Sequence, residues 1–269
     1  VSNLELGVAP FNATVNAMVG KSYGTIFGTD FIKDANGNII VGTNGRYLAT
    51  TTVKPIGNVM PKYNMGISNS FSYKGIDFSF LIDVQHGGQL FSTTYMWGMY
   101  SGILEESAAT NELGNNIRDA VVKNEDGTYS STSGGVLLDG YYGKVNTDGT
   151  VQYLNADGTN SDVPVKNTIR IGGQRYCWDK YGRAQKQNIF SSDYIKLREV
   201  RIGYTIPSKY TGMIKNIRIS AFGRNLAIWG QDLKHIDPEN TTSSGNIQGI
   251  EGGALPSLRT FGLNLTFEF

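Results

Sequence analysis

Two neighbouring stretches of the chain, residues 64–73 and 76–85, alternate between apolar and polar side chains. Their apolar sides consist of Met65, Ile67, Phe71 and Tyr73, and of Ile76, Phe78, Phe80, Ile82 and Val84. A period of two residues is typical of a β-strand with one apolar face. If Lys74-Gly75 forms a two-residue turn, Tyr73 lies opposite Ile76 and the two apolar faces coincide. The pattern therefore predicts a β-hairpin that is apolar on one side.

The same alternation returns in three stretches of the last third of the chain. Their apolar sides consist of Val200, Ile202, Tyr204 and Ile206, of Ile217, Ile219 and Ala221, and of Phe261, Leu263, Leu265, Phe267 and Phe269. Ile195 and Leu197 precede the first set in the opposite phase, which indicates a β-bulge or a change of environment. Pro207 closes that strand, and a turn through Lys209 to Gly212 leads to the next one.

A long polar region, about residues 96–190, separates the two groups of strands. It contains Asp126-Gly127, Asp148-Gly149 and Asp157-Gly158, dipeptides that are preferred where both turn residues need positive φ. We therefore expect small hairpins inside loops. Tight turns at one end of the strands and long loops at the other are typical of outer-membrane β-barrels.

Composition and charge exclude several classes of protein. The 269 residues include 24 Lys and Arg and 23 Asp and Glu, a net charge of +1 that gives no electrostatic basis for binding nucleic acid. The single Cys177 excludes an internal disulfide. No apolar run approaches the roughly 18 to 20 residues of a membrane-spanning helix. The mean hydropathy of −0.25 still allows a barrel, because alternate residues of a barrel strand face a polar lumen.

Candidate catalytic chemistry is sparse in this sequence. His86 and His235 lie far apart and neither has a metal-binding spacing. There is no G-x-S-x-G motif and no phosphate-binding glycine loop, and residues 34–38, DANGN, indicate a turn rather than a calcium loop. We expect no catalytic residue, no metal site and no cofactor.

Aromatic residues in the polar region are the candidate ligand contacts, because aromatic rings stack on the apolar faces of sugars. The candidates are Tyr95, Trp97, Tyr100, Tyr141, Tyr142, Tyr176 and Trp178. The alternative is that these rings form an aromatic girdle at the bilayer interface or pack within loops, and the girdle is the interpretation for Trp229. Asp77 and Asp83 should face the lumen.

Alternation alone does not separate a membrane barrel from a soluble β-sandwich, whose apolar faces pack against each other. Three features favour the membrane: large residues on the apolar faces, the unequal turn and loop lengths, and a final amphipathic strand that ends on Phe269. In a soluble domain, the terminal strand usually continues into a few disordered polar residues.

Several blocks of sequence resemble, in order and at similar spacing, the C-terminal part of the SusC-like (SusC/RagA) TonB-dependent outer-membrane transporters. The blocks are Pro55 to Gly88, Ser191 to Tyr210, Asn216 to Gly230, His235 to Glu239 and Pro256 to Phe269, with Tyr23 to Val41 upstream. The resemblance fades between about residues 96 and 190, where loops diverge.

The resemblance implies an all-β fold, the C-terminal portion of a 22-stranded antiparallel transmembrane β-barrel with long extracellular loops. It places the protein in the outer membrane of a Gram-negative bacterium of the Bacteroidetes type. Such transporters import glycans, oligosaccharides or peptides, pair with a SusD-like surface lipoprotein and are driven by TonB with ExbB and ExbD. In family terms, the strand from Phe261 to Phe269 is the last one and carries the terminal aromatic that the barrel-assembly machinery reads.

The sequence shows no signal peptide, TonB box or plug, and about seven to nine candidate strands. Lipid does not tolerate the unpaired edges of an open sheet. We therefore expect residues 1–269 to be a C-terminal segment whose barrel is closed by the N-terminal part of the same transporter. The competing hypotheses are a secreted β-sandwich that binds carbohydrate and, less in keeping with the strand count, an autonomous small porin or adhesin.

Overall fold

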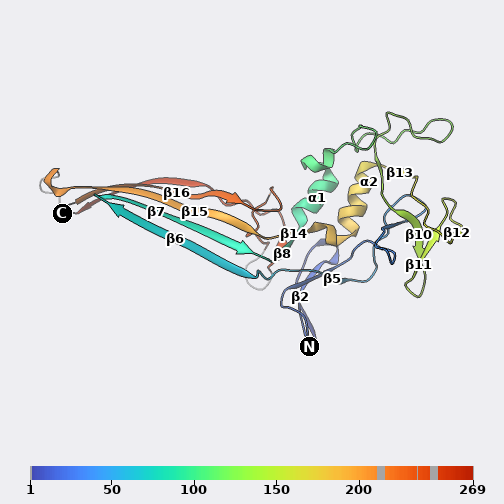
Figure 1. Ribbon diagram of the computed structural model, residues 1–269, viewed down its shortest axis with the longest axis horizontal. Coiled ribbons are helices and arrows are strands. Elements are labelled where there is room, and N and C mark those ends of the chain that lie inside the picture. The colour runs from blue at the N-terminus through green and yellow to red at the C-terminus, as the bar shows by residue number, and fades with distance from the viewer. Residues whose placement is uncertain (1, 211–215, 235, 243–247, 269) are drawn as a thin grey trace.

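A long, gently twisted sheet and a more compact body of loops and helices make up the computed structural model (Figure 1). The structure describes residues 2–210, 216–234, 236–242 and 248–268. The sheet projects to one side, and the segments that precede and interrupt its strands, residues 2–62 and 87–193, pack together at its other end (Figure 1). We call these segments the loop body.

The sheet has five antiparallel strands in the order β18-β16-β15-β7-β6. These are β6 (Tyr63–Tyr73), β7 (Ile76–His86), β15 (Tyr194–Ile206), β16 (Asn216–Trp229) and β18 (Thr260–Glu268). Their lengths of 9 to 14 residues meet the roughly 9 to 11 residues that a transmembrane β-strand needs. In the described part of the chain, the sheet has fewer strands than the seven to nine candidates, because the remaining candidates form short strands of the loop body.

The predicted hairpin is confirmed at every position. Tyr73 pairs with Ile76, and the register continues without a shift to Tyr63 opposite His86. Lys74 and Gly75 both have positive φ, 46° and 84°, the conformation of the two-residue turn that matches the twist of the strands. The two apolar faces therefore coincide as the alternation predicts.

The phase change before Val200 is a β-bulge. Leu197 pairs with Ile82 and Glu199 with Leu81, which leaves Arg198 without a partner on β7. The extra residue restores the phase, so Ile195 and Leu197 share a face with Val200 and the apolar residues that follow it. Of the two alternatives left open by the sequence, the bulge is correct.

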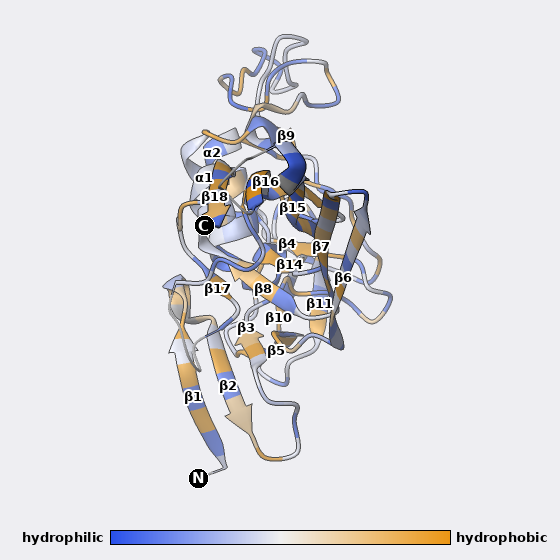
Figure 2. Ribbon diagram, turned by 90° about the vertical axis from the view of Figure 1, so that its left-hand side faces the viewer, coloured by the Kyte–Doolittle hydropathy of each residue, from blue (hydrophilic) through white to orange (hydrophobic). Residues whose placement is uncertain are grey.

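Pairing across the whole sheet brings the apolar sides of all five strands onto one face. Hydrophobic and hydrophilic residues alternate in bands along β6 and β7 (Figure 2). Six rows follow one another, from Phe267, Ile217 and Ile206 at one end to Met65, Val84, Ile195 and Trp229 at the other. Rows two residues apart are about 6.6 Å apart along a strand. At a tilt of about 40°, six rows give a band about 25 Å high, the height of the apolar band of an outer-membrane barrel. Within the described residues this face is open, and Leu263 is 82% exposed.

Short and long connections alternate between the two ends of the sheet. The Lys74-Gly75 turn and the connection after β15 lie at one end, where η5 (Ser208–Tyr210) begins the second turn. The predicted turn runs on to Gly212, but residues 211–215 lie outside the described part. The connections from β7 to β15 and from β16 to β18 lie at the other end and span residues 87–193 and 230–259. The predicted asymmetry of turn and loop lengths is therefore present.

The loop body contains short strands grouped in four small sheets. The first holds β1 (Asn3–Val8), β2 (Thr14–Met18), β3 (Thr25–Gly28) and β5 (Lys54–Asn58), and the second holds β4 (Ile40–Val41), β10 (Tyr141–Val145), β11 (Val151–Leu154) and β12 (Asn160–Ser161). The others pair β9 (Val136–Leu137) with β13 (Arg170–Ile171), and β8 (Gln89–Ser92) with β14 (Ile189–Ser191). On its other side, β8 also pairs with β17 (Ile250–Glu251), which comes from the connection between β16 and β18.

Helices in the loop body depart from the all-β expectation. They are α1 (Thr93–Ser101), α2 (Gly173–Cys177), which continues as the π-helical η3 (Trp178–Arg183), and the 3₁₀ turns η1 (Pro10–Asn12), η2 (Glu105–Ala108) and η4 (Gln185–Asn188). Ser92 caps α1 by accepting a hydrogen bond from the backbone N–H of Tyr95, and Gly102 ends it in the left-handed conformation. No helix among the described residues is both long and apolar enough to cross a membrane.

The predicted Asp-Gly hairpins are confirmed, but their turn type is not the one expected. Residues 146–150 and 155–159 connect β10 to β11 and β11 to β12, and both read N-x-D-G-T. The glycine has positive φ, 85° in Gly149, whereas Asp148 is not among the residues with positive φ. The backbone N–H of Thr150 and its hydroxyl bind the Asp148 carboxylate. That side-chain bridge favours a type I turn followed by a left-handed glycine.

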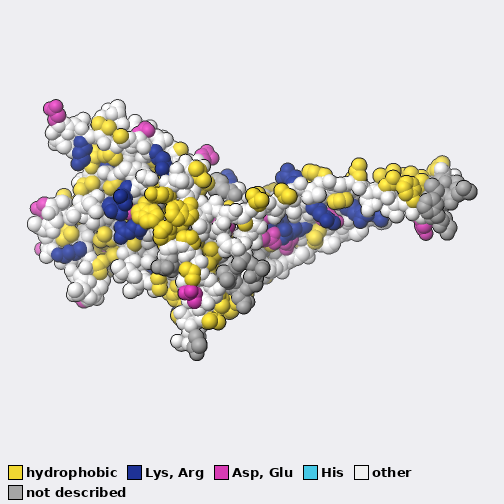
Figure 3. Space-filling model, turned by 180° about the vertical axis from the view of Figure 1, so that it is seen from behind, with side chains coloured by type: hydrophobic (Ala, Val, Ile, Leu, Met, Phe, Trp, Pro, Cys, Tyr) yellow, Lys and Arg dark blue, Asp and Glu magenta, His cyan; other side chains and the backbone are white. Residues whose placement is uncertain are grey.

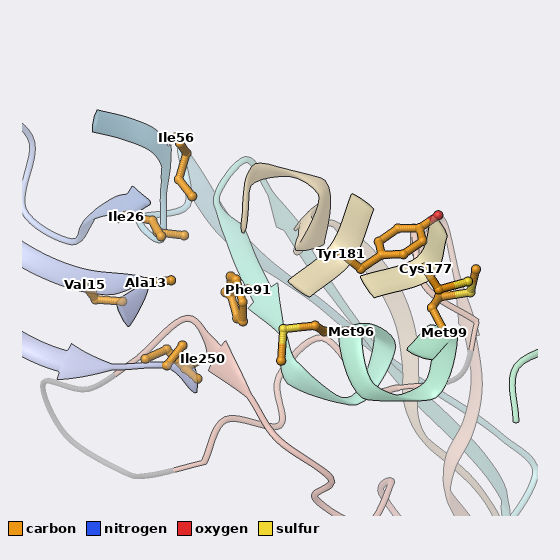
Figure 4. Packing of buried hydrophobic residues seen from close by; sticks show 11 residues of the cluster. Ala13, Val15, Ile26, Ile56, Phe91, Met96, Met99, Cys177, Tyr181 and Ile250 are labelled. Atoms are coloured by element: carbon orange, nitrogen blue, oxygen red, sulfur yellow. The ribbon is translucent and has the colours of Figure 1, made fainter. Parts of the chain in front are cut away.

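A hydrophobic core joins the elements of the loop body (Figure 4). Ile26, Phe91 and Met96 are almost fully buried in it and come from β3, β8 and α1. Cys177 is also buried and has a free thiol. The core therefore ties the segment that precedes the β6–β7 hairpin to the long connection that follows the hairpin.

Candidate functional site

Charged side chains follow the polar face of the sheet, and Figure 3 shows basic and acidic groups along it. Arg218 on β16 bonds Asp77 on β7 at 2.5 Å, and the guanidinium of Arg224 bonds Glu199 at 2.8 Å. Asp77 and Asp83 thus lie on the face opposite the apolar rows, as the alternation predicts. In a closed barrel this face lines the lumen.

The connection from β16 to β18 is tied to this polar face by a cluster of ion pairs. The ammonium of Lys196, nearly buried, bonds Asp237 at 2.5 Å and also contacts Glu239. Arg198, the bulge residue, bonds Asp83 at 2.5 Å and also contacts Glu239. The cluster therefore fixes residues 236–242 against the polar face of the sheet, and the bulge lets Arg198 reach the cluster without disturbing the apolar face.

The carboxylates of the connection remain ionised because they are paired. Burial alone would raise the pKa of Glu239, but hydrogen bonds from Arg198, Lys196 and Tyr194 outweigh it and lower the pKa to about 2. The pKa of Asp237 is also lowered, since burial is offset by hydrogen bonds from Lys196 and Ser257. A buried ion pair that loses one partner is strongly destabilised, so this attachment depends on both sets of charges.

Three of the predicted loop aromatics meet on the loop body. The rings of Trp97 and Tyr100 lie 6.0 Å apart on α1, and Tyr100 lies 5.3 Å from Trp178. Phe11 joins them, at 5.6 Å from Trp97 and 5.1 Å from Trp178. We call these four rings the aromatic surface. Trp97 and Phe11 remain 42% and 41% exposed, so the surface is open to solvent.

The other predicted aromatics lie elsewhere. Tyr95 packs on Tyr181 and Phe190 beside the core. Tyr142 is fully buried, with its hydroxyl next to Thr168, and Tyr176 packs partly buried against the core. The Tyr141 ring lies under the ammonium of Lys166. A fully buried ring offers a ligand no surface, so the side chains of the seven candidates do not form one site.

Phe11 was not among the sequence candidates. It has φ 60° and ψ 30°, a left-handed conformation that is unfavourable for a residue with a side chain. The side-chain amide of Gln185 donates to its carbonyl oxygen. Neither feature has a periodic signal in the sequence, because both depend on segments that meet only in the folded chain.

A cleft of about 460 Å³ opens beside the aromatic surface. Tyr100 and Trp178 line it together with two cations, Arg118 and Arg175, and one acidic residue, Asp119. Arg118 is held in place, since its guanidinium donates to the carbonyl oxygens of Tyr100 and Ser107. Arg175 is exposed and has no ion-pair partner among the described residues. The cleft thus combines aromatic rings with a cation that is free to bind.

The predicted assembly strand corresponds to β18. The side chains of Phe261, Leu263, Leu265 and Phe267 all lie on the apolar face, paired with Gly223, Ala221, Ile219 and Ile217. The fifth residue of that set, Phe269, lies outside the described residues.

Of the two histidines, the structure describes His86. His86 binds Asp193 through its Nδ1 at 2.9 Å, and the backbone N–H of Gly87 donates to the same carboxylate. These contacts join the end of β7 to the start of β15, which is a structural role. His235, predicted to be structural, lies outside the described part.

Comparison with known proteins identifies relatives of this chain. No family model matches the chain. It is 24% identical over 246 residues to the TonB-dependent receptor P3 of Formosa agariphila, an alignment that covers 88% of the chain and 19% of the receptor. The chain resembles a segment of a SusC-like TonB-dependent transporter. The resemblance inferred from the sequence blocks is thereby confirmed.

A solved structure supports the fold of this chain. The RagAB peptide importer in the "open-open" state matches it with a TM-score of 0.51 at 11% identity, over 100% of this chain and 24% of that chain. A structure of the RagAB peptide transporter gives a TM-score of 0.49 at 12% identity, over 98% and 24%. The chain thus spans about a fifth to a quarter of the length of these relatives. Their names describe a receptor and a transporter rather than an enzyme, consistent with a sequence in which no catalytic residue is expected.

Proposed function

We propose that this chain forms part of the barrel wall of a SusC-like outer-membrane transporter. The observation that carries the proposal is the apolar face of the sheet, continuous over five strands and about 25 Å high. A β-sandwich would cover such a face with a second sheet. Among the described residues nothing covers it, and Phe261 and Leu263 are 71% and 82% exposed.

The whole transporter imports a nutrient, a glycan, oligosaccharide or peptide, with energy from TonB, ExbB and ExbD. The open edges of β6 and β18 pair with strands of the N-terminal part of the same transporter and complete a 22-stranded barrel around a plug. The barrel-assembly machinery recognises β18, and outer-membrane lipid covers the apolar face. The resemblance to SusC-like transporters supports a SusD-like lipoprotein as the surface partner.

Residues 96–190 form extracellular loops in this proposal, and the aromatic surface is the part of them that contacts cargo. Its support is the exposure of Trp97 beside a cleft lined by Tyr100 and Trp178. The alternative interpretation, an interfacial girdle, suits Trp229 better, because that ring is 51% exposed at the end of the apolar face.

Cysteine labelling of intact cells tests this orientation, and the native Cys177 is buried and gives little background. Ala156→Cys places a thiol on an exposed hairpin of the loop body, and Lys209→Cys places one in the turn at the opposite end. A membrane-impermeant maleimide should label position 156 in intact cells and position 209 only after the outer membrane is opened.

Labelling of position 209 alone in intact cells would reverse the orientation. Labelling of both positions in a detergent-free, secreted protein would instead support a soluble carbohydrate-binding β-sandwich and end the transporter proposal.

A further inference from the structure

The aromatic surface is held open by a strained backbone. Phe11 occupies the left-handed region at φ 60°, which disfavours residues with a side chain. In this conformation the Phe11 ring packs edge-on against Trp178 and stays 41% exposed. Strain of this kind often accompanies binding sites, where the surrounding structure enforces it. Simple core packing does not need an exposed ring in a strained conformation.

Positive charge accumulates next to this surface. The buried carboxylate of Asp179 bonds Arg46 at 2.6 Å and lies 3.8 Å from Arg183. The buried carboxylate of Asp30 lies 3.4 Å from both Lys54 and Lys186. Each carboxylate thus serves two cations, so each group keeps one excess positive charge.

These cations face solvent close to the aromatic surface. The side chains of Arg183, Lys186 and Lys54 are 41 to 50% exposed. Two of the groups adjoin this surface in the chain, because Asp179 follows Trp178, and Gln185, which donates to the carbonyl oxygen of Phe11, precedes Lys186. Figure 3 shows hydrophobic side chains gathered beside Lys and Arg side chains on the loop body.

We propose that the aromatic surface and the adjoining cleft bind an anionic oligosaccharide, with sugar rings against Trp97 and Trp178 and an acidic substituent on Arg175. The proposal rests on the transporter function proposed above and narrows its cargo to sugars that carry carboxylate or sulfate groups. Guanidinium groups bind both anions through paired N–H donors, so the two substituents share one recognition chemistry.

A sugar fits this surface better than an extended peptide. One common mode of peptide recognition adds main-chain hydrogen bonds at a free strand edge, whereas the rings that form this surface lie in η1, α1 and η3. Aromatic faces with polar groups at their rim suit a ring that is apolar on its face and hydroxylated at its edge. The excess of cations then selects acidic over neutral sugars.

Binding to the purified full-length transporter in detergent tests the proposal by isothermal titration. The probes are tri-galacturonate, its fully methyl-esterified form, which keeps the rings and removes the charges, and tri-glutamate. We expect tri-galacturonate to bind at least about tenfold more tightly than its ester, because hydrogen bonds to charged groups are the strong ones. A chondroitin sulfate tetrasaccharide distinguishes sulfate from carboxylate as the anion.

Three variants locate the site. Arg175→Gln should weaken tri-galacturonate binding about tenfold and leave the ester unaffected, while Trp97→Ala should weaken both. Phe11→Gly relieves the backbone strain and removes the ring, so binding should fall without loss of thermal stability. If Phe11 served only packing, Phe11→Gly would instead lower the thermal stability and leave binding unchanged. Trp229→Ala and Lys144→Gln remove an exposed tryptophan and a cation elsewhere and should change nothing.

Equal affinity for the acid and its ester, unchanged binding in Arg175→Gln and Trp97→Ala, or tighter binding of tri-glutamate would each overturn the inference. A correctly oriented transporter, by the labelling of positions 156 and 209, that fails these binding tests would leave the proposed function intact. Labelling of position 209 alone would remove the extracellular site that this inference requires, and labelling of both positions in a secreted protein would remove the proposed function as well.

Discussion

Arginine placed at successive positions of β18 should report the depth of each residue in the bilayer. The six apolar rows put the midplane between the third row, which contains Leu263, and the fourth, which contains Phe261. With about 5 Å between rows along the membrane normal, Leu263 lies about 2 to 3 Å from the midplane, Leu265 about 7 to 8 Å and Phe267 about 12 to 13 Å.

The cost of arginine on the lipid face falls with distance from the midplane, from about 2 to 4 kcal/mol to about 0 to 1 kcal/mol near the interface. Leu263→Arg should therefore cost about 2 to 4 kcal/mol, Leu265→Arg about 1 to 3 kcal/mol and Phe267→Arg about 0 to 1 kcal/mol. Thr266→Arg and Asn264→Arg lie on the polar face and are the matched controls. Thr266 pairs with Arg218, so like-charge repulsion adds about 0.2 to 1 kcal/mol there.

The assay is guanidinium unfolding of the full-length transporter in phospholipid vesicles, together with the assembled fraction in outer membranes. The expected order of destabilisation is Leu263, Leu265, then Phe267. Equal defects in Leu265→Arg and Thr266→Arg would refute the assignment of the two faces. The largest defect at Phe267 would refute the placement of the midplane.

Two further predictions concern the turn and the ion-pair cluster. Lys74→Asn should stabilise the hairpin by about 0.5 to 1 kcal/mol, since asparagine accepts positive φ more readily. Gly75→Ala should destabilise it, because a Cβ there would lie 2.9 Å from the carbonyl oxygen of Thr205. Thermal unfolding measures both changes in stability, and changes of the same sign would contradict the turn geometry. The pKa of Glu239 is lowered to about 2, so its contribution is fully present above its ordinary value of 4.5 and is lost as the pH falls toward 2. The backbone amides of residues 236–242 should therefore be protected from hydrogen exchange at neutral pH and lose that protection between about pH 4 and 2. In Glu239→Gln the same amides should be unprotected throughout. Protection that does not depend on pH in the unaltered protein would rule out the ion pairs as the attachment.

The sheet was predictable because its strands carry a local signal. Alternation fixes which side of a strand is apolar, and the Lys74-Gly75 turn fixes the register, so Tyr73 opposite Ile76 follows from ten residues of sequence. The bulge at Arg198 also leaves a local trace, a change of phase between Leu197 and Val200.

The aromatic surface was only partly predictable, for a physical reason. Trp97 and Tyr100 are neighbours on one helix, but Phe11 and Trp178 reach them through folding of segments far apart in the chain. Composition identifies aromatic loops without separating an exposed Trp97 from a buried Tyr142. The Asp-Gly turns were located correctly but given the wrong type, because the threonine that follows each pair stabilises a conformation that the dipeptide rule ignores.

The bulge at Arg198 also bears on which deletions the protein can tolerate in its evolution. All positions of β15 except Arg198 follow the two-residue alternation of the strand. Deletion of Gly203 would therefore turn the apolar residues that precede it or follow it in β15 toward the polar face. Loss of Arg198 would join Leu197 to Glu199 in the pairing they already have with β7. The length of the chain at this point can therefore change without moving apolar side chains from one face of the strand to the other. What is lost is the pair of contacts that Arg198 makes with Asp83 and Glu239.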